Sequence, residues 1–320
     1  MLLSRLVVWI LALGGLLPGA AIASDRDYPN RPLRIVTCQA GGGSDLVSRL
    51  IAQGITGGLG QQVIVENRAC GVIPGEIVSV ASPDGYTMLL SGSPLWMSPL
   101  LQEKVRYDPV RDFLPITLVA TSPTVLAVNP SMPVKSVNEL IALAKARPGA
   151  LNYAAAAIGS PNHLAGELFK SMAGVNIVAV PYRGTGPSLS ALIAGEVQVA
   201  FANAASMMPL VKSGKLKGLA VTSLQPSALA PGLPTVAATM PGYQSESIYG
   251  MFAPAKTPAT NISRLNQEIV QFLTRPEVKE KFFSAGLEAV GSPPKQLGTT
   301  VRSEMTRLGK VIKDAGIRAE

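Results

Sequence analysis

Histidine and cysteine are scarce in this sequence, because its 320 residues include one His and two Cys. So few ligands exclude a metal centre with several His or Cys ligands, a zinc ribbon and an iron–sulfur cluster, and we expect no metal and no cofactor. Aromatic residues make up only 5% of the chain, which argues against a stacking platform for nucleic acid. The net charge of +8 is spread along the chain, so it indicates solubility and a mild bias toward anionic ligands, with no nucleic-acid partner.

Apolar runs long enough to span a membrane are also missing, and the run near the N-terminus is short. Arg5 gives residues 1–23 a positive start, and residues 6–17 form an apolar core that is too short and too broken by Gly for a good membrane span. Ala21-Ile22-Ala23 supplies the small residues that signal peptidase requires. We therefore expect a signal peptide cleaved after Ala23 and export to a bacterial periplasm. The alternative is an uncleaved N-terminal anchor.

The rest of the chain alternates short β-rich segments with amphipathic stretches, which is typical of a parallel sheet covered by helices. The expected strands are 33–37, 63–65, 86–90, 151–155, 175–180, 197–202 and 216–222, with a longer apolar run at 118–128. The expected helices are 46–55, 73–81, 136–146, 161–173, 187–194 and 206–212, with a mainly helical segment at 262–315. No flexible linker separates the two α/β units, so we predict two lobes joined by more than one crossing of the chain.

A run of glycines, Gly41-Gly42-Gly43, leaves the first strand and enters a helix through Ser44 and Asp45. Glycines allow backbone N–H groups to approach a ligand, and a helix N-terminus carries partial positive charge. This combination suits a carboxylate or a phosphate, although the spacing is not that of a nucleotide-binding motif. Asp45 is interpreted as the N-cap of the helix, with contact to an amino group as its alternative, and a plain tight turn is the alternative for the loop.

A second loop of the same kind is Gly159-Ser160-Pro161-Asn162-His163. Ser160 is a natural N-cap, and Pro161 fits the first helical position. The free N–H groups of this turn would suit a second anionic group. His163 is the only imidazole in the chain, and two interpretations stay open for it: a packed or capping side chain, or a ligand contact.

Further polar residues follow other predicted strands, where parallel sheets place their ligands. Arg183 lies between Tyr182 and Gly184, where it would either fork onto a carboxylate or form a surface ion pair. Asn203 follows the strand at 197–202 and is a candidate amide donor. Ser91 and Ser93 follow the third strand and are candidate hydroxyl donors.

Cys38 and Cys70 lie just beyond the ends of the first two strands. An oxidising compartment permits a disulfide between them, and two separate buried thiols are the alternative. Catalysis is weakly supported. A Ser-His-Asp triad would have to use His163, no G-x-S-x-G elbow occurs, and a Cys–His pair would compete with the bridge.

Nine short segments together resemble the Bug-type extracytoplasmic solute-binding receptors of tripartite tricarboxylate transporters, and they cover nearly the whole chain after the signal. These segments are 28–36 (YPNRPLRIV), 41–45 (GGGSD), 65–68 (VENR), 83–87 (PDGYT), 152–154 (NYA), 159–167 (GSPNHLAGE), 180–184 (VPYRG), 219–223 (LAVTS) and 233–236 (LPTV).

The resemblance implies a two-lobed α/β periplasmic binding fold of the Venus flytrap, type II-like, in which each lobe is a mostly parallel sheet flanked by helices. We expect lobe one to comprise 24–122 plus 248–320 and lobe two 123–247, with hinges near Ser122-Pro123 and Ser247-Ile248. The lobes would close over a small organic carboxylate, which is delivered to membrane permease subunits. Such a receptor is not an enzyme, and we expect a monomer.

The resemblance also assigns ligand-binding residues by position. The implied ligand residues are Gly42, Gly43, Ser44 and Asp45 in lobe one and Ala157, Gly159, Ser160, His163, Tyr182, Arg183, Gly184 and Asn203 in lobe two.

Two departures from the family pattern lie at the mouth of lobe one. Thr37-Cys38-Gln39-Ala40 replaces a Pro-Phe-Pro-Pro-like segment, and Ala69-Cys70-Gly71-Val72-Ile73 replaces a Pro-Gly-Ala-Gly-Gly segment. Because each change introduces a Cys, the pair favours the bridge, and both changes leave the identity of the acid open. The loops are nearly neutral, with one Arg, which favours a mono- or dicarboxylate. The alternative functions are a sensor subunit that signals through a partner, and a hydrolase or isomerase using His163.

Overall fold

The computed structural model describes residues 28–102, 104–155 and 159–318. The predicted signal segment and Ala157 lie outside the described residues. None of the helices in the described ranges is long and apolar enough to cross a membrane.

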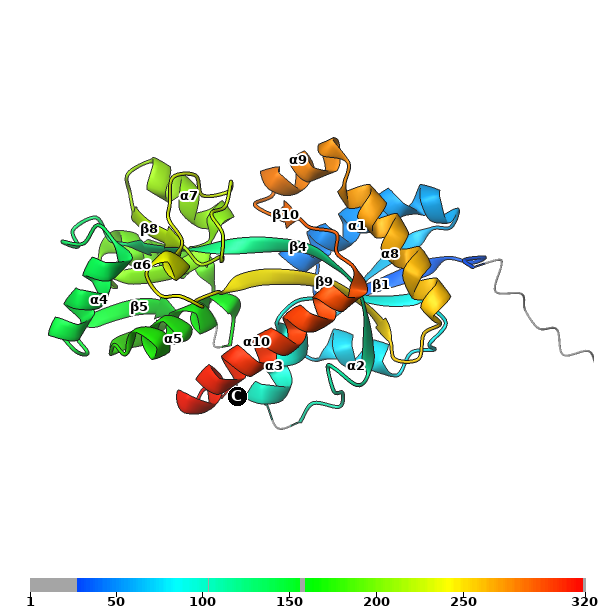
Figure 1. The fold of residues 1–320 in the computed structure, drawn as a ribbon, viewed down its shortest axis with the longest axis horizontal. Coiled ribbons are helices and arrows are strands. Elements are labelled where there is room, and N and C mark those ends of the chain that lie inside the picture. Colours follow the sequence, from blue (N-terminus) through cyan, green and yellow to red (C-terminus); the bar gives the residue numbers. More distant parts are fainter. Residues whose placement is uncertain (1–27, 103, 156–158, 319–320) are drawn as a thin grey trace, which may run out of the picture.

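Two long antiparallel strands join the lobes, β4 (Phe113–Val128) and β9 (Glu246–Pro254). Their register runs from Phe113 opposite Pro254 to Pro123 opposite Glu246. The second half of β4 continues into the other lobe, where it pairs with β7 and β8. Figure 1 shows both strands running side by side between the two lobes. The chain therefore crosses between the lobes on paired strands rather than on a flexible linker.

The first lobe is built on the parallel strands β2-β1-β3, with β9 added antiparallel to β3. Its core lies between this sheet and the helices α1 and α8, where Val47, Ile51 and Leu265 are fully buried. Besides β4 and β9, the elements of this lobe are β1 (Leu33–Thr37), α1 (Gly43–Leu59), β2 (Val63–Asn67), α2 (Ile73–Ser79), β3 (Thr87–Ser91), α3 (Pro94–Leu101), α8 (Ala259–Leu273), α9 (Pro276–Ser284) and β10 (Glu288–Ala289).

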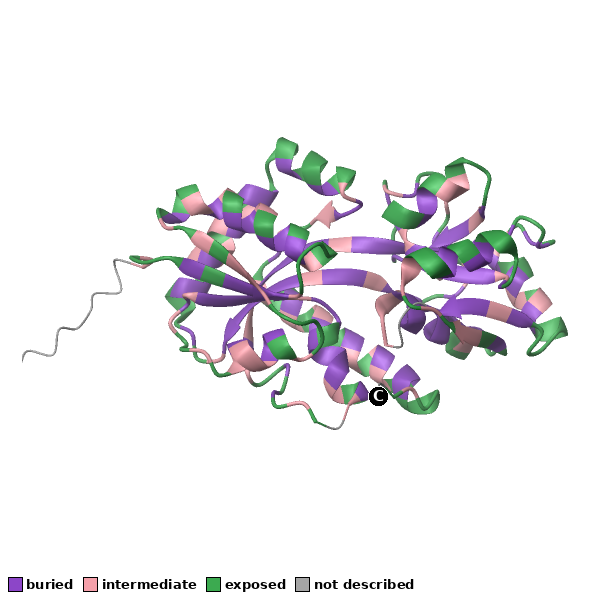
Figure 2. Ribbon diagram, turned by 180° about the vertical axis from the view of Figure 1, so that it is seen from behind, coloured by how far each residue is buried: buried purple, intermediate pink, exposed green. Residues whose placement is uncertain are grey.

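The second lobe repeats the pattern with the parallel strands β6-β5-β7, and β4 adds antiparallel to β7. Its elements are α4 (Val137–Ala146), β5 (Leu151–Ala155), α5 (Pro161–Ala173), β6 (Ile177–Pro181), α6 (Thr185–Ala194), β7 (Val199–Asn203), α7 (Ala204–Lys212), β8 (Lys217–Val221) and the 3-10 turn Val236–Ala238. Figure 2 shows that buried residues follow the strands of both lobes, while exposed residues gather on the outer faces of the helices.

The last helix, α10 (Pro294–Asp314), packs on β4 and on one helix from each lobe, α3 and α5. Its buried residues, among them Val301 and Leu308, belong to a hydrophobic cluster that also contains Trp96 of α3 and Leu164 of α5. One apolar cluster therefore extends from one lobe to the other along α10.

Most predicted elements are confirmed within a few residues, and three differences matter. Helix α1 runs past Gly57 and Gly58 to Leu59, because Leu59 is buried and the helix ends only at Gly60, which has a φ of 66°. Helix α3 and strand β9 were not predicted. Strand β9 depends on its partners, because it is hydrogen-bonded to β3 on one side and to β4 on the other.

Candidate functional site

A cavity of about 240 Å³, called the interlobe pocket below, lies where β1, β3 and β9 meet the first turns of several helices. It is lined by Cys38, Ser44, Cys70, Gly71, Pro74, Leu90, Ser91, Gly92, Ser93, Pro94, Pro161, Ser247, Ile248 and Tyr249. A second hollow of about 320 Å³ adjoins it over the glycine loop, Gln39 to Gly43, and shares Cys38, Ser44 and Cys70.

The interlobe pocket has no charged side chain among its lining residues. Its polar groups are hydroxyls from Ser44, Ser91, Ser93, Ser247 and Tyr249. Four helices begin at its wall, because Ser44, Pro74, Pro94 and Pro161 stand in the first turns of α1, α2, α3 and α5. Helix N-termini carry partial positive charge, so the pocket favours an anion without presenting a cation.

The first turn of α1 offers free donors. Its N-cap is Gly42, which has no side chain to satisfy the turn. The N–H groups of Gly43, Ser44 and Asp45 have no acceptor among the described residues, and the first hydrogen bond of the helix is that from the N–H of Leu46 to the carbonyl of Gly42 at 3.0 Å. These N–H groups are therefore available to a ligand carboxylate.

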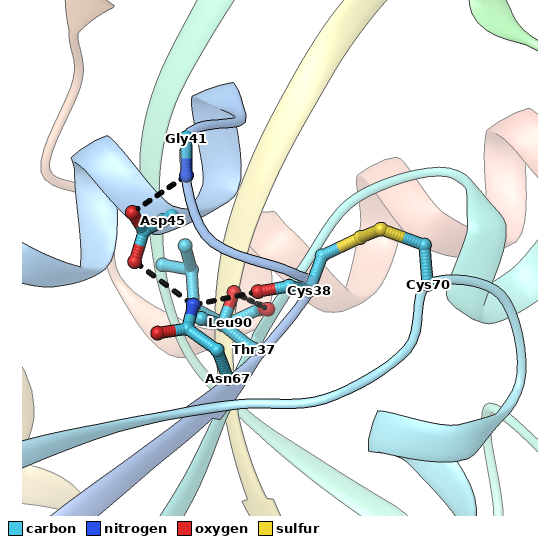
Figure 3. Close-up of a disulfide and its surroundings, with 7 residues drawn as sticks. All are labelled: Thr37, Cys38, Gly41, Asp45, Asn67, Cys70 and Leu90. Atoms are coloured by element: carbon cyan, nitrogen blue, oxygen red, sulfur yellow. Dashed lines mark hydrogen bonds between the residues drawn. A yellow bond between two sulfur atoms is a disulfide. The ribbon is translucent and has the colours of Figure 1, made fainter.

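A disulfide joins Cys38, after β1, to Cys70, after β2, with their Cα atoms 4.7 Å apart (Figure 3). The sequence had left this pairing open. Beside it, the Asn67 amide donates to the carbonyl of Cys38 at 2.7 Å and to Oδ1 of Asp45 at 2.8 Å. The disulfide and the two hydrogen bonds of the Asn67 amide thus help to hold the loops after β1 and β2 together. Asn67 belongs to the segment 65–68 (VENR), but no local pattern in the sequence indicates this role.

The interpretation of Asp45 as the N-cap is wrong. Asp45 lies inside the first turn, where its Oδ2 accepts the N–H of Gly41 at 3.0 Å and its Oδ1 pairs with Nε of Arg49 at 2.9 Å. Burial pushes the pKa of this carboxyl upward, but the bonds from Arg49, Gly41 and Asn67 outweigh it and lower the pKa to about 2. Asp45 is therefore ionised, and its carboxylate stabilises the glycine loop through the hydrogen bonds from Gly41 and Asn67.

The second-lobe loop has the local structure that its sequence predicts. The Ser160 hydroxyl caps α5 by accepting the N–H of His163 at 3.3 Å, and Pro161 takes the first helical position. The Nδ1 of His163 accepts the N–H of Gly159 at 3.0 Å, and its ring stacks on Tyr153 with centroids 6.5 Å apart. Burial lowers the pKa of His163. These contacts describe the packed histidine of the first interpretation, with Nδ1 already occupied.

The remaining predicted residues of lobe two lie at strand ends but not on the wall of the interlobe pocket. Arg183 is exposed, and no hydrogen bond or ion pair joins it to another described residue. Tyr182 packs on the core of lobe two, and Gly184 is the N-cap of α6 with a φ of 107°. Asn203 reaches the crossing strand, because its Oδ1 accepts the hydroxyl of Ser247 at 3.4 Å.

Two residues near the pocket had no signal in the sequence. Glu304 of α10 is buried, and its Oε2 accepts the Ser93 hydroxyl at 3.3 Å and the indole N–H of Trp96 at 2.9 Å. Tyr249 of β9 lines the pocket from the crossing strand. Among the described residues, no group of three or more His, Cys, Asp and Glu side chains is placed to hold a metal ion.

Comparison with known proteins agrees with this architecture. Residues 47–317 match the TctC family, described as tripartite tricarboxylate transporter family receptor. The chain is 34% identical to BugT of Bordetella pertussis over 305 residues, which is 93% of this chain and 94% of BugT.

Two solved structures are similar over nearly their full length. Rpa4515 of R. palustris with adipate is 36% identical, with a TM-score of 0.74 over 91% of this chain and 99% of that one. MatC from Rhodopseudomonas palustris with bound malate is 28% identical, with a TM-score of 0.70 over 89% of this chain and 100% of that one. The fold is therefore the expected two-lobed fold of periplasmic binding proteins, and the chain belongs to the TctC family of tripartite tricarboxylate transporter receptors.

Proposed function

We propose that the protein captures a small organic carboxylate in the interlobe pocket and delivers it to membrane permease subunits. The observation that carries the proposal is a pocket without charged side chains that is surrounded by helix N-termini, including the free N–H groups of Gly43 and Ser44. Such groups bind a carboxylate by charge-assisted hydrogen bonds, which are strong in a dry cleft. The relatives with adipate and with malate support the same ligand class.

Capture proceeds by closure of the two lobes. Lobe one comprises residues 24–122 plus 248–320, and lobe two comprises residues 123–247. Bending occurs where β4 and β9 cross, near Ser122-Pro123 and Ser247-Ile248. Closure is a shift of population toward the state that binds the ligand better. It brings the loops of lobe two toward the pocket, where Gly159, Arg183 and Asn203 reach the ligand.

The other proposed ligand residues divide between the two lobes. They are Gly42, Gly43, Ser44, Asp45, Ser91 and Ser93 in lobe one, and Ala157, Ser160, His163, Tyr182 and Gly184 in lobe two. Asp45 and His163 act by shaping their loops, since the Asp45 carboxylate already accepts the N–H of Gly41 and Nδ1 of His163 accepts that of Gly159. The protein works as an exported periplasmic monomer without a cofactor, and it catalyses no reaction.

A thermal-shift screen of the protein against organic acids, with amino acids and sugars as controls, tests the function. A ligand at 100 times its Kd should add about 2.7 kcal/mol to the free energy of unfolding, which raises the Tm by several degrees. One chemical cluster of acids that raises the Tm and is recovered unchanged is the expected result. Absence of any shift, or consumption of the hit, would overturn the proposal.

Arg183 provides a test of closure. Because it is exposed and unpaired among the described residues, Arg183→Ala should leave the Tm of the free protein unchanged. It should weaken binding of the acid if Arg183 swings onto a carboxylate when the lobes close. Unchanged affinity, measured by titration calorimetry, would remove Arg183 from the ligand site.

A further inference from the structure

Tyr249 stands at a distinctive place in the fold. It lies on β9, one of the two strands that join the lobes, and opposite Ala120 of β4. Its ring packs against the hydrophobic core of the first lobe, and the residue lines the interlobe pocket. The side chain is therefore held by lobe one while its backbone belongs to the crossing strand.

The hydroxyl of Tyr249 is directed at the first residue of α1. A Cβ built on Gly43 would collide with this hydroxyl, and it would lie 3.2 Å from Cζ of the ring. Gly43 is thus the residue that lets the hydroxyl approach the start of the helix. The same turn carries the N–H groups of Gly43 and Ser44, which have no acceptor among the described residues.

The Tyr249 hydroxyl also lacks a hydrogen-bond partner among the described residues, although the side chain is half-buried. Burial raises the pKa of this phenol, so it carries its proton at neutral pH. A protonated phenol has one O–H to donate. Three kinds of donor therefore converge at the start of α1: backbone N–H groups, the Ser44 hydroxyl and the Tyr249 hydroxyl.

We propose that Tyr249 is a specificity-determining ligand residue, whose hydroxyl donates a hydrogen bond to the ligand carboxylate held at the N-terminus of α1. This inference rests on the proposed function, since it needs a carboxylate in the interlobe pocket. Because Tyr249 lies on β9 directly after the proposed hinge at Ser247-Ile248, the ligand is bound by lobe-one residues that stand beside the hinge.

The donor set distinguishes a carboxylate from its amide. Both oxygens of a carboxylate accept hydrogen bonds from these donors. A carboxamide has an NH₂ in place of one oxygen, and because this NH₂ cannot accept a hydrogen bond, the bonds on that side of the group would be lost. A hydrogen bond to a charged group corresponds to about ten- to a hundredfold in affinity. Removal of the Tyr249 hydroxyl should therefore lower the affinity of the pocket for acids by roughly this factor. The ratio of acid affinity to amide affinity should fall as well.

The experiment is titration calorimetry of the wild type, Tyr249→Phe and Tyr107→Phe with adipate, malate, benzoate, adipamide and benzamide. Tyr107 is the matched control, because its buried hydroxyl likewise has no partner and the residue does not line the interlobe pocket. We expect Tyr249→Phe to keep its Tm and lose acid affinity, while Tyr107→Phe binds as the wild type does. Equal affinity of Tyr249→Phe and the wild type would overturn the inference and leave the receptor function standing. Failure of every acid in the thermal-shift screen to stabilise the wild type would instead refute the proposed function.

A ligand-free measurement tests the geometry itself. Gly43→Ala should lower the Tm in the wild-type background, because the new methyl group collides with the Tyr249 hydroxyl. In the Tyr249→Phe background the remaining contact at Cζ is 3.2 Å, so the same substitution should cost less. An equal loss of Tm in both backgrounds would show that the hydroxyl does not lie against Gly43, and would overturn the inference independently of any ligand.

Discussion

The carboxylate of Glu304 in α10 accepts a hydrogen bond from the indole Nε1 of Trp96 in α3 at 2.9 Å. The same oxygen accepts the hydroxyl of Ser93, which lines the interlobe pocket. The C-terminal helix thereby holds the start of α3 in place from behind the pocket. Of the charged groups that face Glu304, Arg307 lies one turn further along α10, 3.8 Å away, and Glu246 comes from β9.

Glu304 should make stability depend on pH. Burial raises its pKa from 4.5 to about 7, although Trp96, Arg307 and Ser93 lower it in part. Because the folded state keeps the proton more tightly than the unfolded state, this contribution is complete below pH 4.5 and is lost as the pH rises toward 7. The loss amounts to about 3 kcal/mol at most.

Urea unfolding between pH 4.5 and 8 measures this effect. Glu304→Gln should flatten the profile relative to the wild type, while Glu277→Gln, at an exposed position of α9, should leave it unchanged. Parallel profiles for the wild type and Glu304→Gln would show that Glu304 does not hold its proton in the folded state.

The disulfide should contribute to both stability and ligand binding. Cys38 and Cys70 are separated by 32 residues, and the chain-entropy account assigns a bridge of that span about 3–4 kcal/mol. Because both residues line the interlobe pocket, the double variant Cys38→Ser, Cys70→Ser should also bind its acid more weakly. Urea unfolding and calorimetry with and without dithiothreitol measure the two effects.

The double variant also serves as the control for reduction. Dithiothreitol should lower the stability and the acid affinity of the wild type, and it should leave those of the double variant unchanged. Mass spectrometry of the untreated and reduced wild type should differ by about 2 Da, the two hydrogens that reduction adds. An identical mass would mean that the two thiols are free.

Asn67 should prove necessary for the shape of the glycine loop. Asn67→Ala removes the bonds to the Cys38 carbonyl and to Asp45, and it leaves two part-buried acceptors with fewer partners. We expect a loss of about 1–3 kcal/mol in the free energy of unfolding together with weaker acid binding. Asn176→Ala, at an exposed position before β6, is the control. Wild-type affinity in Asn67→Ala would show that the loop forms without this side chain.

The two serine N-caps offer a matched comparison. Ser160 caps α5 beside the pocket, and Ser136 caps α4 by accepting the N–H of Glu139 at 3.2 Å. Each change to Ala should cost about 1 kcal/mol of stability. Only Ser160→Ala should alter the affinity for the acid, because α5 starts at the pocket wall. Equal affinities of the two variants would place Ser160 outside the ligand site.

Local patterns in the sequence predicted much of the fold. The segments 33–37 and 151–155 are β1 and β5, as their β-rich composition indicates. Ser160 and Pro161 begin α5 as expected, because N-cap chemistry depends on residues within one turn. The hydroxyls of Ser91 and Ser93 do line the pocket, since the ends of parallel strands meet at one edge of a sheet. Whether they contact the ligand stays a prediction.

The sequence by itself determined the alternation of strands and helices, the glycine loops and the scarcity of charge in them, because these depend on neighbours along the chain. Only the tertiary structure decided the pairing of Cys38 with Cys70, the bond from Trp96 to Glu304 and the approach of Tyr249 to Gly43. It also reassigned Asp45 from a cap to a partner of Gly41, Arg49 and Asn67. The physical reason is that the disulfide, the Trp96–Glu304 bond, the Tyr249–Gly43 approach and the Asn67–Asp45 bond each join residues from separate elements, and no periodicity along the chain records which elements will meet.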